Sequence, residues 1–337
     1  MIYRNGVQFL FKRKNAELKV ACIFDPFTFK CFEPECSLFQ ITPGNWKREL
    51  EDINPDFVFI ESAWQGKDDL WGGKVITLYA EIGDIAKYCA ERFIPLIFWN
   101  KEDPYGYETF LNTARIADVV LTTATECVDN YKRELNHENV YFMHFAAQPS
   151  MHNPIEEYER EDKFCFAGAY YKQFPDRVKD FDILYNTLNN YKGVDIYDRF
   201  HNDKKRCFPA KYRQSVKGTL PYNEISKAYK GYNFGININT ITDSDSMFAR
   251  RVFELMASNT IVVGNYSKGL VSYFGDLTIS SNDPNEIIER LNEICKTKDT
   301  FEEFRKRALE RVMSRELYSH RLKFICDILF GEEIGVR

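Results

Sequence analysis

The sequence predicts an α/β protein with two Rossmann-like parallel-sheet domains facing a central cleft. Short, wholly apolar segments such as DFVFI and PLIFW alternate with helical segments, as in parallel sheets covered on both faces. A chain of 337 residues suits two domains of roughly 150 residues each. Between 148 and 162 the composition changes to two prolines and a run of charges, which indicates a linker.

The first half of the chain shows repeated strand–helix alternation, which predicts an open parallel sheet with helices on both faces. Strands are expected at 7–11, 18–24, 38–41, 56–60, 95–99, 119–122 and 140–142, and helices at 46–53, 81–93, 106–117 and 126–135.

A second alternating series follows the linker. Strands are expected at 164–167, 194–197, 234–239, 260–263 and 277–279, and helices at 175–190, 222–229, 247–258, 284–295, 301–312 and 318–330. Doubly wound domains bind ligands at the carboxyl ends of their strands, so chemistry is sought in the residues that follow those ends.

Composition excludes several classes of protein. Apolar residues make up 44% and charged residues 28% of the chain, typical of a globular protein. The net charge of −5 argues against general nucleic-acid binding; a local basic run at 203–217 is most simply a solvated loop. Nine cysteines without paired CxxC spacing favour reduced thiols over a disulfide framework or zinc site. No apolar run is long enough for a signal peptide or membrane span, so we expect a cytoplasmic protein, with peripheral contact at the inner face of the membrane left open.

The most informative stretch is 234–264, FGININTITDSDSMFARRVFELMASNTIVVG, read as strand, loop, helix and strand. The helix is expected to begin near Met247, with Asp245 or Ser246 as its N-cap. Unpaired backbone N–H groups at such a start would form an anion site, with Arg250 and Arg251 adding positive charge.

Glu254 lies four residues after Arg250 and could hold ribose hydroxyls. The plain alternative is an i,i+4 ion pair between the two on a solvated face. Against it, cations oppose the dipole at a helix N-terminus, so two arginines there suggest an anion.

Asp243-Ser244-Asp245 forms a DxD triplet. In one class of sugar transferases this triplet holds Mn²⁺. Just before a helix, capping and loop structure are the more natural roles for Asp and Ser, and we expect no bound metal.

Two other strand ends in the second half carry candidate binding residues. Gly168 and Tyr170 lie in FAGAYY, and Tyr197 and Arg199 in DIYDRF. Gly168 could admit a phosphate or ribose or simply form a turn; Tyr197 could stack on a base, while Arg199 could bind it or pair with Asp198. There is no GxGxxG and no P-loop.

In the first half, carboxylates follow two buried strands and could deprotonate an acceptor hydroxyl. Trp64 and Trp99 could form a sugar platform or lie in the core, and His144 is most simply structural. The carboxylates are Glu61, Asp68, Asp69, Glu102 and Asp103, the last of which, before a proline, could instead start a turn.

These segments together resemble the CgeB-like (spore maturation protein) family of GT-B glycosyltransferases, which is related to enzymes that decorate teichoic acids and other bacterial surface polymers. The resemblance runs from about residue 57 to 274 and is carried by ESAWQGK, WNKEDP, FMHFAAQPSMHNP, FAGAYY with the arginine that follows it, IYDR and SMFARRVFELMAS. The last is similar to the family's R-x-F-E-x-x-A segment.

The resemblance implies a GT-B-like fold with an acceptor-binding domain at 1–153, a nucleotide-sugar-binding domain at 154–314, and a C-terminal helix at 315–337 packing back on the first domain. Glu254 would hold ribose, and the helix start would hold diphosphate through Ser246, Met247, Phe248 and Arg250. Related retaining enzymes often carry two glutamates eight positions apart, and here Ser246 stands at the first position. The positioning of the donor sugar and the stereochemical outcome are therefore unassigned.

Our leading hypothesis is a metal-independent glycosyltransferase that needs no cofactor. Its donor would be a nucleotide sugar of the UDP type, and its acceptor a hydroxyl of a glycan, surface polymer or lipid-linked molecule. Arg250 would stabilise the leaving group, with Lys217 as an extra cation and Glu61 or Asp103 near the acceptor. The rival hypotheses are a UDP-sugar epimerase on the same scaffold and a non-catalytic nucleotide-sugar-binding subunit.

Overall fold

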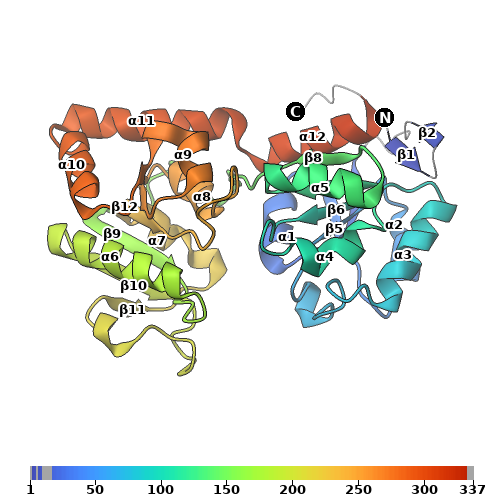
Figure 1. Ribbon diagram of the computed structural model, residues 1–337, viewed down its shortest axis with the longest axis horizontal. Coiled ribbons are helices and arrows are strands. Elements are labelled where there is room, and N and C mark those ends of the chain that lie inside the picture. The colour runs from blue at the N-terminus through green and yellow to red at the C-terminus, as the bar shows by residue number, and fades with distance from the viewer. Residues whose placement is uncertain (1, 5–6, 10–16, 332–337) are drawn as a thin grey trace. The chain divides into compact units, whose positions relative to one another are not determined.

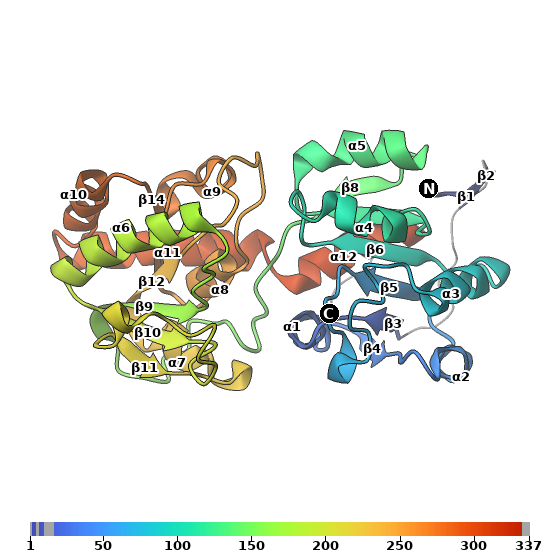
Figure 2. The ribbon, with the colours of Figure 1, turned by 60° about the horizontal axis from the view of Figure 1, so that its bottom comes forward.

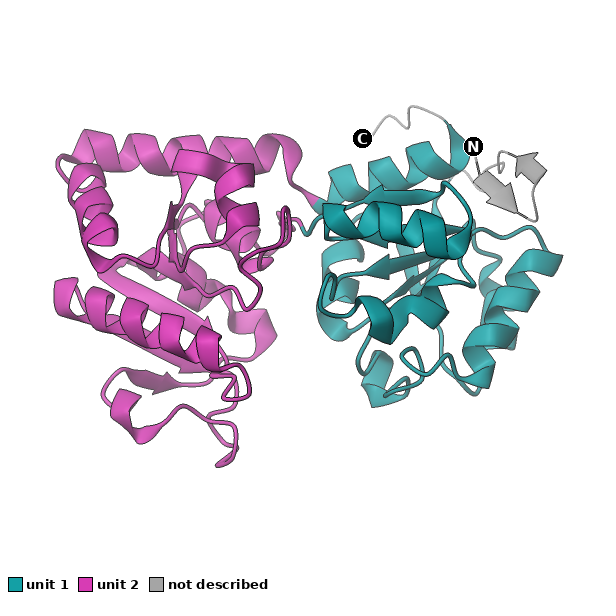
Figure 3. Cartoon of the chain, viewed as in Figure 1, with its two compact units in different colours: residues 1–145, 318–337 teal, residues 146–317 magenta. Residues whose placement is uncertain are grey.

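The chain forms two compact units in a computed structural model that describes residues 2–4, 7–9 and 17–331. Unit 1 comprises residues 1–145 and 318–337, and unit 2 comprises residues 146–317 (Figure 3). The composition change expected to separate two domains lies within the first stretch of unit 2.

Unit 1 contains a six-stranded, all-parallel sheet in the order β4-β3-β5-β6-β7-β8, with helices interleaved between the strands (Figure 1). The strands are β3 (Lys19–Ile23), β4 (Ser37–Gln40), β5 (Phe57–Glu61), β6 (Leu96–Asn100), β7 (Val119–Thr122) and β8 (Val140–Phe142). The helices are α1 (Pro26–Phe32), α2 (Trp46–Ile53), α3 (Ala80–Glu91), α4 (Tyr107–Ala114), α5 (Thr125–Leu135) and the short η1 (Lys67–Asp69).

The burial of β5 and β6 agrees with their central position in the sheet. β5 and β6 are buried at every position, as expected of central parallel strands covered by helices on both faces. The helix α1 was not predicted: it has only seven residues, and its proline occupies the first turn, where the missing N–H costs nothing. Its Phe32 packs against Phe59 with ring centroids 5.6 Å apart.

The helix α12 (Tyr318–Phe330) returns the chain to unit 1. Tyr318 stacks edge-on against Phe32 at 4.9 Å and Phe324 against Tyr141 at 6.2 Å. Its apolar face, with Leu329 fully buried, thus completes the core of unit 1.

Unit 2 contains a second six-stranded parallel sheet, in the order β11-β10-β9-β12-β13-β14, seen from another side in Figure 2. The strands are β9 (Glu161–Gly168), β10 (Val194–Asp198), β11 (Val216–Gly218), β12 (Tyr232–Asn237), β13 (Ile261–Gly264) and β14 (Ile279–Ser280). The helices are α6 (Pro175–Tyr191), α7 (Ser226–Lys230), α8 (Arg251–Ala257), α9 (Lys268–Phe274), α10 (Pro284–Ile294) and α11 (Lys298–Arg315), with short turns η2 (Ala210–Tyr212), η3 (Tyr222–Glu224) and η4 (Gly275–Leu277).

The prediction of two parallel-sheet α/β units is confirmed, with local differences besides the unpredicted α1. β11 and α9 were not predicted, and the helix expected at 222–229 divides into η3 and α7. Near the N-terminus, β1 (Ile2–Arg4) and β2 (Val7–Phe9) pair as an antiparallel hairpin, whereas the last part of the strand expected at 7–11 lies outside the described residues. Among the described helices, none combines the length and the apolar character that crossing a bilayer requires.

We predict that Leu329→Ala lowers the free energy of unfolding of unit 1 by about 2–5 kcal/mol, because it leaves a cavity in a closed core. All four tryptophans, at 46, 64, 71 and 99, lie in unit 1, so tryptophan fluorescence during urea unfolding reports that unit. The exposed Leu70→Ala serves as control. Equal unfolding midpoints for the two variants would contradict the packing role of α12.

Candidate functional site

Arginine side chains converge at the carboxyl edge of the unit 2 sheet, around the turn that follows β9. The turn spans residues 168–171 and receives Arg251 from α8, Arg199 from the end of β10 and Arg177 from α6. Gly168 makes the approach possible, because a Cβ atom there would lie 2.8 Å from Nη2 of Arg251. Its role is to leave room for a guanidinium.

Each of these arginines is held by contacts that leave its charge uncompensated. Arg177 Nη1 donates to the carbonyl of Ala169 at 3.2 Å, and its guanidinium lies 4.9 Å from the ring centroid of Tyr171. Arg199 Nη1 donates to the Tyr171 hydroxyl at 3.3 Å. The Arg251 guanidinium lies 4.9 Å from the ring centroid of Phe166. Aromatic faces and carbonyls position the cations but do not neutralise them.

The electrostatic consequence is mutual repulsion. Within the described residues, Arg177, Arg199 and Arg251 form no ion pair, and the Nε atoms of Arg177 and Arg251 are buried without a hydrogen-bond partner. Burial, and then the charge of Arg251, lowers the pKa of Arg177 to about 10. Desolvation together with the charges of Arg250 and Arg251 lowers the pKa of Arg199. Such a cluster is stabilised by a bound anion.

Glu254 lies beside this cluster, fully buried on α8. Its Oε2 accepts a hydrogen bond from the Tyr229 hydroxyl at 2.7 Å, and Arg250 Nε lies 3.3 Å from its Oε1. The alternative of an i,i+4 ion pair named the right partners, Arg250 and Glu254. It was wrong to place the pair on a solvated face, because the Glu254 carboxylate is buried. Burial acts to raise the pKa of Glu254, but Arg250, His152 and Tyr229 outweigh it and lower the pKa.

The helix that carries Glu254 begins later than predicted. α8 starts at Arg251, and the residues before it form a loop held by side chains of unit 2. Ser244 Oγ accepts from the Met247 amide at 2.9 Å, and Asn239 Oδ1 accepts from the Ala249 amide at 2.9 Å. These amides are therefore engaged within the protein, and the expected anion site of free amides near Met247 is corrected: the positive charge comes from guanidinium groups.

The DxD triplet serves the loop, as the sequence interpretation favoured. Ser244 is buried and caps the turn, whereas Asp243 and Asp245 are exposed and Asp245 pairs with Lys268. No group of three or more His, Cys, Asp or Glu side chains that could hold a metal ion occurs in the described part of the chain.

The other predicted binding residues occupy different environments. Phe248 is buried and stacks on Phe253 at 5.3 Å, so its side chain belongs to the core. Tyr170 packs against Phe208 at 5.2 Å in an aromatic cluster beneath the arginines. Tyr197 is half-buried near Tyr232.

Unit 1 uses its predicted catalytic carboxylates internally. Glu61 is fully buried and accepts from the Asp25 amide at 2.6 Å and the Thr28 hydroxyl at 2.5 Å. Lys101 Nζ lies 3.2 Å from Glu61 and 3.1 Å from Asp25. Burial raises the pKa of Glu61, yet every oxygen of this carboxylate already has a partner.

Asp103 is also buried in unit 1. Its Oδ1 accepts from Asn100 Nδ2 at 2.7 Å and its Oδ2 from the Thr122 hydroxyl at 2.6 Å. Tyr131 donates a further, longer hydrogen bond of 3.3 Å. The geometry gives Asp103 a structural environment and offers no support for its catalytic role.

The remaining candidates in unit 1 divide between surface and core. Trp64 is exposed, whereas Trp99 is fully buried. His144 is buried, and its Nδ1 accepts from the Phe145 amide at 2.7 Å, as expected for a structural histidine.

Three residues of the unit 2 site had no role assigned to them from the sequence: Arg177, Tyr229 and His152. Arg177 lies on a helix whose amphipathic pattern gives no reason to single it out. His152 is buried, and its Nε2 has no hydrogen-bond partner; burial lowers its pKa to about 4, against the opposing effect of Glu254. Only its place in the MHNP segment of the linker could have signalled it.

Most of unit 2 and part of α12 match a known protein family. The family described as "Glycosyl transferase-like" matches residues 161–327. The match begins where β9 begins and contains the arginine cluster and Glu254. No curated protein is significantly similar in sequence to the chain.

Solved structures establish the fold class. Anabaena HepE, solved with UDP and glucose, has a TM-score of 0.55 and 11% identity over 93% of this chain and 100% of that one. Trehalose-6-phosphate synthase of Burkholderia multivorans has a TM-score of 0.53 and 10% identity over 85% of this chain and 74% of its own. These similarities confirm the predicted GT-B-like class.

A mutant of S. aureus TarM, solved with fondaparinux, α-GlcNAc-glycerol and UDP, has a TM-score of 0.51 and 12% identity over 84% of this chain. The present chain spans 57% of the length of that TarM chain. At these identities the likeness concerns the fold.

We predict that Asp103→Asn flattens the pH dependence of stability between about pH 4 and 7. Burial raises the Asp103 pKa to about 7, whereas the unfolded chain loses this proton near its ordinary value of 3.8. The native state thus binds more protons in this window, and stability falls as pH rises, by at most about 1.4 kcal/mol per pH unit. Urea unfolding followed by tryptophan fluorescence measures the slope, with exposed Asp84→Asn as control; an unchanged slope in Asp103→Asn would refute the assignment.

We predict that Arg251→Met abolishes the rise in melting temperature that pyrophosphate produces in the native protein. Without ligand, the variant should melt no lower than the native protein, because losing one of several like charges offsets the lost contact with Phe166. Arg290→Met, at a half-buried position on α10, is the control. A full pyrophosphate response in Arg251→Met would show that the anion binds elsewhere.

Proposed function

We propose that the protein is a glycosyltransferase that uses a nucleoside-diphosphate sugar, of the UDP type, as donor. Unit 2 would bind the donor. The observation that carries the proposal is a set of arginines around the 168–171 turn that have no acidic partner in the part of the chain that the structure describes and that adjoin a buried carboxylate, Glu254. A diphosphate needs the cations and a ribose needs the acceptor oxygen, and the two lie side by side at one sheet edge.

Glu254 would receive ribose hydroxyls through Oε1, the oxygen that has no hydrogen-bond partner. Tyr229 holds the other oxygen at 2.7 Å and thereby fixes the carboxylate. Because its pKa is lowered, Glu254 is ionised at neutral pH and accepts only. Ribose binding would release Arg250 from Oε1 toward the diphosphate.

In the transfer step, the bond between the anomeric carbon and the donor phosphate oxygen breaks, and the acceptor oxygen forms the new glycosidic bond. Negative charge develops on the departing diphosphate, and Arg177, Arg199, Arg250 and Arg251 would stabilise it electrostatically. The cluster supplies the positive charge that a metal ion supplies elsewhere, so we propose metal-independent transfer. The acceptor proton would pass to a base that neither Glu61 nor Asp103 supplies as placed.

The finer assignments belong to the same proposal. The CgeB-like motifs in the sequence, and the UDP present in the HepE and TarM structures, support a UDP-sugar donor. A glycan, surface-polymer or lipid-linked acceptor follows from the resemblance to surface-polymer glycosyltransferases, with unit 1 as the acceptor-binding domain and a cytoplasmic location at or near the membrane.

The proposal predicts that Glu254→Gln weakens UDP binding at least about 10-fold, because it loses one charge-assisted hydrogen bond of about 1.5–3 kcal/mol. Titration calorimetry with UDP measures the affinity, and the exposed Glu293→Gln is the control. Unchanged affinity in Glu254→Gln would remove the assignment of the site.

Turnover separates the rival functions. Incubation of the native protein with UDP-GlcNAc alone should release no epimerised nucleotide sugar, whereas an epimerase would form it without an acceptor. Release of UDP that depends on an added glycan would establish transfer. Binding of UDP without turnover on any acceptor would instead indicate a non-catalytic subunit.

A further inference from the structure

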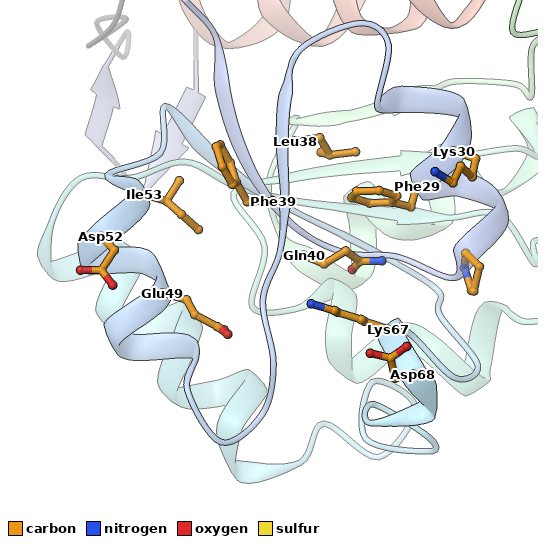
Figure 4. A pocket seen from close by; sticks show the side chains of 11 residues that line it. Phe29, Lys30, Leu38, Phe39, Gln40, Glu49, Asp52, Ile53, Lys67 and Asp68 are labelled. Carbon is orange, nitrogen blue, oxygen red and sulfur yellow. The ribbon is translucent and has the colours of Figure 1, made fainter. Parts of the chain in front are cut away.

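A groove in unit 1 is lined by neither Glu61 nor Asp103. It has a volume of about 540 Å³, within the range of small-ligand sites. It runs from the carboxyl edge of the sheet around the outer strand β4, between α1 and α2 (Figure 4). Its lining residues come from α1, β4, α2 and η1: Pro26, Phe29, Lys30, Leu38, Phe39, Gln40, Glu49, Asp52, Ile53, Lys67 and Asp68.

The apolar part of the lining is divided between the two walls. Phe39 lies beside Ile53 of α2, while Phe29 and Leu38 lie on the α1 side (Figure 4). Phe39 is 39% exposed, unusual for a large apolar side chain that has a neighbouring core to join. The rings offer flat faces to a ligand that carries C–H groups.

The polar part of the lining is of mixed charge. Two of the lining residues are lysines and three are carboxylates, so the charges nearly cancel and neither a strong cation nor a strong anion is favoured. Glu49 is engaged with the amide and hydroxyl of Thr42. The side chains of Asp52, Lys67 and Asp68 have no hydrogen bond or ion pair within the described residues, so both donors and acceptors of the groove are unused.

The η1 side of the groove is fixed before any ligand arrives. The Asp25 carboxylate accepts from three consecutive amides, those of Trp64, Gln65 and Gly66, at 3.1, 3.0 and 2.8 Å. Lys101 forms ion pairs with both Asp25 and Glu61. This buried network therefore positions the segment that carries Lys67 and Asp68.

The same segment is held in an unfavourable backbone conformation. Asp68 and Asp69 have φ angles of 51° and 60°, in the left-handed region that costs a non-glycine residue about 1 kcal/mol or more. This backbone conformation and the Asp25 hydrogen bonds together fix the segment that carries Lys67 and Asp68 before a ligand binds. A preformed site loses less conformational entropy on binding.

We propose that this groove binds a neutral saccharide, with a sugar ring against Phe39 and its hydroxyl groups hydrogen-bonded to Asp52, Lys67 and Asp68. A saccharide combines C–H faces with hydroxyls that both donate and accept, which matches a lining of rings with unused groups of both signs. A purely apolar ligand would cover these charges without giving them partners. If the proposed function holds, on which this last step rests, the groove recognises the glycan part of the acceptor.

The test uses the full chain without nucleotide and three neutral disaccharides as probes: maltose, cellobiose and N,N′-diacetylchitobiose. Saturation-transfer NMR should detect binding of at least one of them. Phe39→Ala should weaken it at least fivefold, and the double variant Lys67→Ala/Asp68→Ala should do the same. Phe93→Ala, another exposed phenylalanine of unit 1 outside the groove, should bind as the native protein does.

The proposal would be overturned if the native protein transferred saturation to none of the three disaccharides. It would also be overturned if Phe39→Ala and the native protein transferred saturation to them equally. Preference for a hydrophobic tripeptide over every saccharide would assign the groove to a peptide and also overturn it. UDP titration of the same variants separates the two proposals: UDP binding without saccharide binding rejects the groove alone, and the reverse rejects the donor site alone.

Discussion

Repulsion among guanidinium groups is the constraint that organises the carboxyl edge of unit 2. Arg177, Arg199 and Arg251 come from three elements and are held by carbonyls and aromatic rings, none of which cancels charge. Like charges gathered at one edge repel one another, and the charge of Arg251 acts to lower the pKa of both Arg177 and Arg199. A fold that retains this arrangement gives up stability in the empty state and recovers it when a polyanion binds.

Unit 1 handles charge in the opposite way. Its buried carboxylates are matched by Lys101, by hydroxyls and by backbone amides, so that Glu61 and Asp103 are fully engaged inside the sheet edge. These buried charges of unit 1 maintain its shape, whereas Arg177, Arg199 and Arg251 of unit 2 form no ion pair within the described residues. This difference is why the proposed donor site in unit 2 can be argued from its charges, whereas Glu61 and Asp103 of unit 1 give no comparable argument.

Much of the fold could be predicted because hydrophobic patterning dominates buried parallel strands: β7, β8, α2 and α12 lie where the sequence places them. The seven-residue α1 was missed because it is too short to show a helical period. The start of α8 was misplaced because Ser244, a good helix cap by type, caps a loop turn instead.

Some residues of the candidate site could likewise be predicted from the sequence, and others could not. Arg251, Glu254, Gly168 and Arg199 could be found because each follows a strand or opens a helix at the binding edge. Arg177 could not, since only the packing of α6 on the sheet brings it to the turn after β9. Burial could not be foreseen for Asp103, because a carboxylate before a proline looks like a surface turn in sequence.

The return of α12 to unit 1 also orders the events of biosynthesis. Unit 2 is one continuous segment, 146–317, whereas unit 1 needs residues from both ends of the chain. As the chain leaves the ribosome, unit 2 has all its parts before unit 1 does, and the face that Tyr318 and Leu329 later cover stays open until residues 318–330 have also emerged. Unit 2 can therefore complete its fold first, although most of unit 1 is synthesised before it. Unit 1 is the part most in need of chaperone protection while it waits for α12.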